Sequence, residues 1–287
     1  MKFLKALVVL MVVSLPFIYG YSTIKNGTWA LAQKVTNLGQ MPPEISESSG
    51  LEMADDANTF FTHSDHGNGA PVLYKIDHSG KLLKTYPISG ASLVDWEDLT
   101  RDESGNLYIG DVGNNNGNRS KLKIYKTNVS NPGAAQTISF SYDSRDAVES
   151  KGKKGKGKAK TAKNFNSEAI FWHNGNLYLV TKASGGNGEA HLFQVSDSPG
   201  SHTAKLIGSK ELGAKITSAD ISPSGDKLVL MSLGKLHIFN ISGSDYFKGN
   251  AQTINLGNVG QTEGMVFTDN NNIVFCNESG QLFKYSF

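Results

Sequence analysis

Three glutamates stand at the same position of a repeated sequence pattern. Glu97, Glu168 and Glu263 each precede a hydrophobic residue by two places, at the start of an apolar run. If these runs are equivalent strands, the three carboxylates point in similar directions and meet at one place. Two like charges about 6 Å apart repel by roughly 3 kcal/mol at an effective dielectric constant of about 20. Protonation, a basic partner or a bound cation must therefore balance them.

A hard metal ion is the cation that these residues favour. The neighbouring acids Asp98 and Asp220 extend the set, and the chain has one cysteine and seven histidines. Ca²⁺ prefers carboxylate and carbonyl oxygens, whereas zinc prefers cysteine and histidine. We therefore expect a calcium site, with candidate ligands Glu97, Glu168, Glu263, Asp98 and Asp220. The alternative is that each glutamate caps backbone N–H groups at its own blade.

A polar loop and a histidine supply the other candidate residues. The segment Gly110–Arg119 reads GDVGNNNGNR and is rich in side-chain oxygens, but it does not have the spacing of a calcium-binding EF-hand. His63 and Asp65 can form an acid–base pair. The candidate ligand-binding residues are Asp95, Asp111, Asn114, Asn115, Arg119 and Lys182. The catalytic candidates are His63, Asp65, Arg119 and Lys182. No GxSxG, HExxH, P-loop or paired CxxC motif occurs in the sequence.

The elements that must position these residues are repeated strand pairs. Five times, a short polar and acidic cluster opens an apolar run, and a second run follows about ten residues later. The first runs begin at ESSGL (47–51), DWEDL (95–99), NSEAI (166–170), TSADI (217–221) and QTEGM (261–265). A period of about 45 residues is typical of a β-propeller, in which each small sheet buries its faces against its neighbours. The starts of the innermost strands then share one face of the molecule.

The pattern predicts an all-β chain forming a single propeller. Third and fourth strands follow most pairs, but the chain ends on a third strand at Phe287. We expect the N-terminal segment Trp29–Leu38 to supply the missing outer strand and to close the ring. Five blades are favoured. Six blades are the alternative, because the interval between Leu99 and Ile170 is longer than the others.

The bulk charge is misleading because the lysines are clustered. Seven lysines lie in Lys151–Lys163 (KGKKGKGKAKTAK), and removing them together with Lys2 and Lys5 turns the net charge of +2 into −7. We expect residues 150–164 to form a disordered insertion that can contact an anionic surface. Nucleic acid is not the expected partner, since no aromatic side chains interleave with the lysines.

Residues 1–22 resemble an export signal. Lys2 and Lys5 precede an apolar stretch that ends near small residues at Gly20 and Ser22. The propeller domain then spans residues 23–287, and the protein is secreted or periplasmic. An uncleaved membrane anchor is the alternative, although the apolar run is shorter than the ~20 residues that a spanning helix needs. Cys276 is expected to be a core residue, and the protein is expected to be a monomer.

On these motifs the chain resembles exported bacterial propellers of the SdiA-regulated and phytase-like type. The matching motifs are SSGL with THSDHGN, DWEDL with YIGDVGNNNGNR, SEAI with LYLVTK, and QTEGMVF, over residues 44–287. The resemblance implies that Glu263, Glu168 and Glu97 are calcium ligands near a phosphate-binding site. Arg119 and Lys182 are the basic candidates for that site, fewer than a highly phosphorylated substrate would need.

Two functions from different classes follow. The first is an exported, calcium-binding propeller that binds a small-molecule or polymer ligand at its axial mouth without catalysis. The alternative is a calcium-dependent phosphoric-ester hydrolase in which the metal polarises the phosphate. Paired carboxylates in a propeller channel can also cleave sugars, and this glycosidase hypothesis ranks third. Because the propeller fold hosts many unrelated functions, the fold by itself does not identify which of these functions the chain has.

Overall fold

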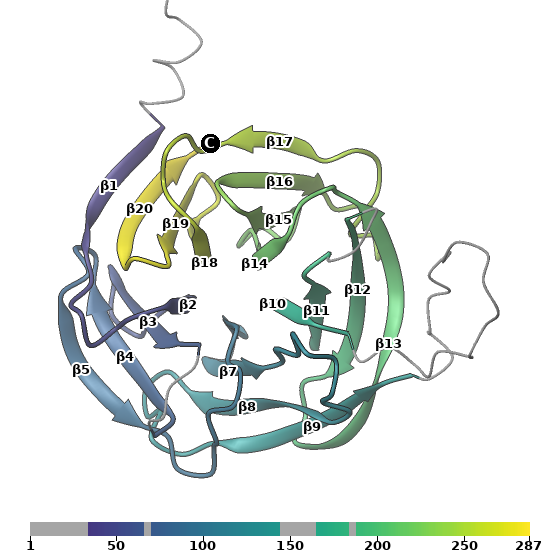
Figure 1. Cartoon of the computed structure of the whole chain (residues 1–287), viewed down its shortest axis with the longest axis horizontal. Coiled ribbons are helices and arrows are strands. Elements are labelled where there is room, and N and C mark those ends of the chain that lie inside the picture. Colours follow the sequence, from purple (N-terminus) through teal and green to yellow (C-terminus); the bar gives the residue numbers. More distant parts are fainter. Residues whose placement is uncertain (1–33, 66–69, 144–164, 184–187) are drawn as a thin grey trace, which may run out of the picture.

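Four sheets are arranged as a ring around a central axis (Figure 1). The computed structural model describes residues 34–65, 70–143, 165–183 and 188–287, and in these ranges it contains strands β1 to β20 and no helix. Three sheets have four strands and one has eight. In the eight-stranded sheet, two groups of four are joined by the parallel pairing of β9 with β13.

Each group follows the same order along the chain, from an inner strand to an outer one. The first group contains β2 (Ser48–Met53), β3 (Thr59–Ser64), β4 (Val72–Asp77) and β5 (Leu82–Pro87). The second contains β6 (Asp98–Arg101), β7 (Asn106–Asp111), β8 (Leu122–Asn128) and β9 (Gln136–Tyr142). The third contains β10 (Ser167–His173), β11 (Asn176–Thr181), β12 (Glu189–Ser196) and β13 (Gly200–Glu211). The fourth contains β14 (Ile216–Ile221), β15 (Lys227–Ser232), β16 (Lys235–Asn240) and β17 (Gln252–Asn255).

The last group joins the two ends of the described chain. It contains β18 (Thr262–Asp269), β19 (Asn272–Asn277), β20 (Gln281–Ser286) and, as its outer strand, β1 (Val35–Gln40). β1 runs antiparallel to β20, and the Met41 N–H donates to the Gly280 carbonyl at 2.8 Å just beyond the pairing. The predicted closing strand is therefore confirmed. It spans Val35–Gln40, whereas the sequence predicted residues 29–38, of which residues 29–33 lie outside the described chain.

Ring closure is visible in the inner strands and in the core. The inner strands contact one another in the order β2, β6, β10, β14, β18 and back to β2. Five hydrophobic clusters fill the spaces between successive groups, for example Phe61 with Trp96, and Phe171 with Leu228. The chain is an all-β propeller, as predicted. Its division into five blades stays a prediction, because two of the groups share one sheet.

The second strand of each group is almost completely buried. β7, β11, β15 and β19 are buried at every position but the first, and β3 at every position but the last. These strands appear in the sequence as continuous apolar runs because both of their faces pack against neighbouring sheets. Their packing holds the inner strands, and the polar residues at the inner strand starts, in fixed positions around the axis.

Candidate functional site

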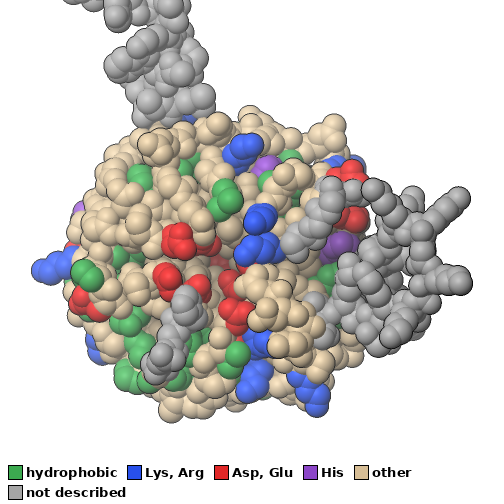
Figure 2. Space-filling model, in the orientation of Figure 1, with side chains coloured by type: hydrophobic (Ala, Val, Ile, Leu, Met, Phe, Trp, Pro, Cys, Tyr) green, Lys and Arg blue, Asp and Glu red, His purple; other side chains and the backbone are tan. Residues whose placement is uncertain are grey.

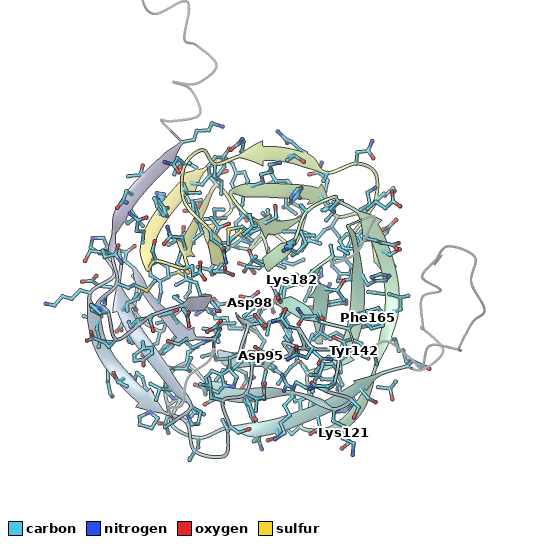
Figure 3. All side chains as sticks on the ribbon, viewed as in Figure 1. Asp95, Asp98, Lys121, Tyr142, Phe165 and Lys182 are labelled. Carbon is cyan, nitrogen blue, oxygen red and sulfur yellow. The ribbon has the colours of Figure 1, made fainter. Side chains whose placement is uncertain are left out.

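The starts of the inner strands bring the predicted carboxylates together. Glu97 directly precedes β6, and Glu168 and Glu263 are the second residues of β10 and β18. Figure 2 shows acidic side chains gathered near the middle of this face, and in Figure 3 Asp95 and Lys182 lie around the same central opening. We call the site formed by Asp95, Glu97, Glu168, Lys182 and Glu263 the axial mouth.

Lys182 supplies a positive charge inside the axial mouth. Its ammonium group forms an ion pair with Glu168 Oε1 and also interacts electrostatically with Glu97 and Glu263. Burial alone would lower the pKa of Lys182, but its ion pair with Glu168 and the nearby carboxylates raise it overall. Of the three ways to balance the carboxylates, the structure shows a basic partner.

The carboxyl groups of the mouth hold their protons more tightly than in water. Burial raises the pKa of Glu97 well above its usual value, and the charges of Glu168 and Asp95 raise it further. Burial also raises the pKa of Glu168, against the opposing effect of Lys182, and raises the pKa of Glu263 to about 7. The pKa of Asp95 is raised by burial as well, although Arg119 opposes this. A positively charged ligand in the mouth would therefore favour the ionised form of these carboxyl groups.

Two amides in the mouth were not among the predicted residues. Asn166 Nδ2 donates to Glu168 Oε1 at 2.9 Å, and Gln261 Nε2 donates to Glu263 Oε1 at the same distance. In both cases the amide stands two residues before the glutamate, where residues i and i+2 of a strand lie on the same side. The signal is visible in the sequence as N-S-E and Q-T-E. In the third copy, D-W-E, Asp95 takes the place of the amide.

The polar loop after β7 is held together by Arg119. Its guanidinium donates to Asp111 Oδ1 at 2.7 Å and to the carbonyl of Gly113 at 2.5 Å. Burial raises the pKa of Asp111 against the opposing charge of Arg119. Asp111 Oδ1 also accepts the Asp95 N–H at 3.1 Å, so the loop fixes the position of Asp95.

The two predicted asparagines of this loop have different environments. Asn114 is buried, donates through Nδ2 to the Arg119 carbonyl at 3.1 Å and accepts the Arg119 N–H at 3.0 Å. Asn115 is exposed, and its Oδ1 accepts a hydrogen bond from Asn166 Nδ2 at 3.1 Å. Asn114 therefore shapes the loop, whereas Asn115 links it to the start of β10.

Asp98 lies on the axis but is sealed from solvent. Its carboxylate accepts the N–H groups of Leu99 at 2.9 Å, Ile170 at 3.1 Å and Ala219 at 3.4 Å, and the Ser218 hydroxyl at 3.2 Å. The side chain thus joins β6, β10 and β14, and it is completely buried. Burial raises the pKa of Asp98 well above its usual value, although these donors oppose the shift.

Asp220 is separated from the mouth along the axis. It lies one residue from the end of β14, and its oxygens accept the N–H groups of Ile221 and Phe267, both at 2.7 Å. Its electrostatic neighbours are Glu52 and Arg101, which lie at the ends of β2 and β6. Asp98 and Asp220 thus each hold a backbone N–H group of their own strand and further N–H groups of other inner strands.

His63 is a core residue at the boundary of the first and second groups. It is fully buried, its Nδ1 lies 3.0 Å from the Ser64 carbonyl, and its ring packs edge-on against Trp96 with centroids 5.4 Å apart. Burial lowers its pKa to about 4, so the imidazole is neutral at physiological pH. Asp65 is half-buried near the mouth and interacts electrostatically with Glu97. This geometry does not offer His63 to a substrate as a general acid or base.

The mouth does not contain a complete set of metal ligands among the described side chains. Within residues 34–65, 70–143, 165–183 and 188–287, no group of three or more His, Cys, Asp or Glu residues could hold a metal ion. The Lys182 ammonium lies among the three predicted glutamate ligands. Ca²⁺ would have to displace this ammonium, or bind mainly through Asp95 and Glu97 with backbone oxygens and water.

Comparison with solved structures gives the same fold. The PQQ-bound aldose sugar dehydrogenase (Adh) from Streptomyces coelicolor has a TM-score of 0.50 and 11% sequence identity over 88% of this chain and 97% of that chain. The fold is a β-propeller. The β-propeller domain of Cps50 (Swd1) from Myceliophteria thermophila has a TM-score of 0.45 and 10% identity over 88% of this chain and 99% of that chain. At such low identity the likeness shows the fold alone. No family description and no curated protein sequence matches the chain.

Three sequence-based expectations fall outside the described residues. They are the export signal at residues 1–22, residues 29–33 of the closing segment, and the lysine-rich insertion at residues 150–164. In the part of the chain that is described, no helix is long and apolar enough to span a membrane.

Proposed function

We propose that this protein is an exported, non-catalytic β-propeller that binds a positively charged ligand at its axial mouth. The observation that carries the proposal is the excess of buried or half-buried carboxylates over cations at one opening. Asp95, Glu97, Glu168 and Glu263 share this opening, and Lys182 is ion-paired with Glu168. Repulsion among the acids favours a ligand that brings further positive charge.

The charges of the mouth do not favour phosphate chemistry. Arg119 and Lys182 were the predicted contacts to a phosphate, and both are already engaged by carboxylates, Asp111 and Glu168 respectively. His63, the predicted acid–base residue, is buried and neutral. A phosphate ester would therefore meet an acidic surface without free basic groups among these candidates, and the hydrolase alternative has less support than ligand binding.

Ca²⁺ is the inorganic cation that this proposal tests first. The test is a thermal-shift titration of the full chain with CaCl₂ and with EDTA. A ligand at 100 times its Kd stabilises a protein by about 2.7 kcal/mol, which is roughly 5–10 °C for a domain of this size. A rise of this kind that Glu97→Gln abolishes supports a calcium-binding mouth. The exposed Glu103, in the β6–β7 turn at the other end of the inner strands, provides the control Glu103→Gln.

Catalysis and export have their own tests. We expect no hydrolysis of p-nitrophenyl phosphate with or without Ca²⁺, and calcium-dependent turnover lost in Glu97→Gln would replace the binding function with the hydrolase. Fractionation of cells expressing the chain with and without residues 1–22 tests export, and retention of the full chain in the membrane fraction would indicate the anchor. The monomeric state and contact of Lys151–Lys163 with anionic surfaces stay predictions.

A further inference from the structure

Within the described part of the chain, the side chains of Asp95 and Glu97 are a carboxylate pair without a hydrogen-bond donor. Glu168 and Glu263 each accept a hydrogen bond from the amide two residues earlier, but Glu97 has the acid Asp95 in that position. Neither carboxylate of the Asp95–Glu97 pair accepts a hydrogen bond or a close ion pair from the rest of the described chain. A buried or half-buried carboxylate that lacks such partners is costly unless a ligand supplies them.

The two carboxylates converge on the backbone of the loop after β7. A Cβ atom on Gly113 would collide with Oε1 of Glu97 and with the carboxylate of Asp95. The main chain holds this arrangement, because the Gly113 N–H donates to the Asp95 carbonyl at 3.2 Å and the Glu97 N–H donates to the Gly110 carbonyl at 2.9 Å. The absence of a side chain at Gly113 therefore leaves room for both carboxylates at one point.

A buried polar atom beside the pair also lacks a partner. Asp111 is completely buried, and its Oδ1 accepts the Asp95 N–H and the Arg119 guanidinium. Its Oδ2 has no hydrogen-bond partner in the described structure. Buried polar atoms are nearly always hydrogen-bonded in native proteins, so the residue that binds the Asp95 N–H carries an unusual unsatisfied acceptor.

Lys182 indicates that an ammonium group is a cation that fits the axial mouth. A primary ammonium group has three donors and no acceptor, and the mouth already holds one against Glu168. The described side chains do not offer a group of three metal-binding residues, whereas a pair of carboxylates suits an ammonium group. We propose that the axial mouth binds small alkylamines, with the ammonium group of the ligand donating to Asp95 and Glu97. This inference rests on the proposed function and names the chemistry of the ligand.

The test is isothermal titration calorimetry of the full chain with 1,5-diaminopentane at fixed ionic strength. We expect saturable binding to the wild type. Loss of one charge-assisted hydrogen bond weakens binding by about tenfold or more, which we expect for Glu97→Gln and, independently, for Asp95→Asn. The matched control is Glu103→Gln, which removes an exposed charge in the β6–β7 turn at the other end of the inner strands and should change the affinity little. Equal melting temperatures would show that the variants fold.

The outcomes separate this inference from the proposed function. If the diamine does not bind the wild type, or binds Glu97→Gln and Asp95→Asn as tightly as the wild type, the amine site is wrong. If Ca²⁺ binds under the same conditions and the diamine does not, the mouth binds a cation but not an amine. If neither binds, both proposals fail.

Discussion

Replacement of Asp98 tests how the axis of the propeller is held together. Asp98→Ala leaves the buried N–H groups of Leu99 and Ile170 without their acceptor, and it also removes the longer contact with Ala219. Each unsatisfied buried donor costs about 1–3 kcal/mol, so the first two alone predict a loss of about 2–6 kcal/mol. The total free energy of unfolding of a domain is only about 5–15 kcal/mol, so this loss is severe.

The assay is urea denaturation followed by circular dichroism, with Asp98→Asn as the milder variant. The asparagine keeps one oxygen acceptor but places an NH₂ group toward backbone donors, and we expect a loss of about 1–3 kcal/mol. Glu103→Gln, in the adjacent hairpin turn, should be unchanged within about 0.5 kcal/mol. A folded Asp98→Ala protein that loses less than about 1 kcal/mol would refute the role of Asp98 as the acceptor that joins three inner strands.

Three further predictions concern the mouth. Burial raises the pKa of Glu263 from 4.5 to about 7, so the folded protein holds this proton more tightly than the unfolded chain. The free energy of unfolding should therefore fall as the pH rises from about 4.5 through 7. Thermal melts of Glu263→Gln should show a weaker pH dependence than those of the wild type, and an identical dependence would contradict the shift. Arg119→Ala leaves the buried Asp111 carboxylate without its ion pair and should cost about 1–3 kcal/mol in chemical denaturation, whereas an unchanged midpoint would mean that the pair adds nothing. Gly113→Ala should push the side-chain carboxylates of both Glu97 and Asp95 aside, with a small change in melting temperature but at least about tenfold weaker diamine binding; unchanged affinity would place the ligand elsewhere.

The fold was predictable because its signal is local and repeated. Each second strand is an apolar run, and each hairpin carries its own turn residues. Asp77 and Asp102, for example, accept the N–H groups of the turns that follow them, and the glycines of these turns, Gly80 and Gly105, have φ angles of 86° and 79°. Such features depend on residues only a few positions apart, so the sequence contains them directly.

The site was predictable in part. The sequence correctly placed Glu97, Glu168 and Glu263 at the starts of inner strands, and a ring of such strands must bring their starts together. It did not show that Asp98, adjacent to Glu97, is sealed within the axis. Side chains alternate along a strand, so Asp98 and Glu97 point in opposite directions. The sequence does not show what Asp98 meets there, because Ile170 and Ala219 belong to other groups of strands.

The sequence by itself determined the repeated strand order, the acidic character of the inner strand starts and the closing role of the N-terminal strand. Only the tertiary structure decided which carboxylates are satisfied. The Asp98 carboxylate meets the N–H groups of Ile170 and Ala219, which are 72 and 121 residues away in the chain, whereas the side-chain carboxylates of Asp95 and Glu97 meet no hydrogen-bond donor in the described chain. The physical reason is that a hydrogen bond depends on distances of about 3 Å, and closure of the ring sets these distances between segments that are remote in sequence.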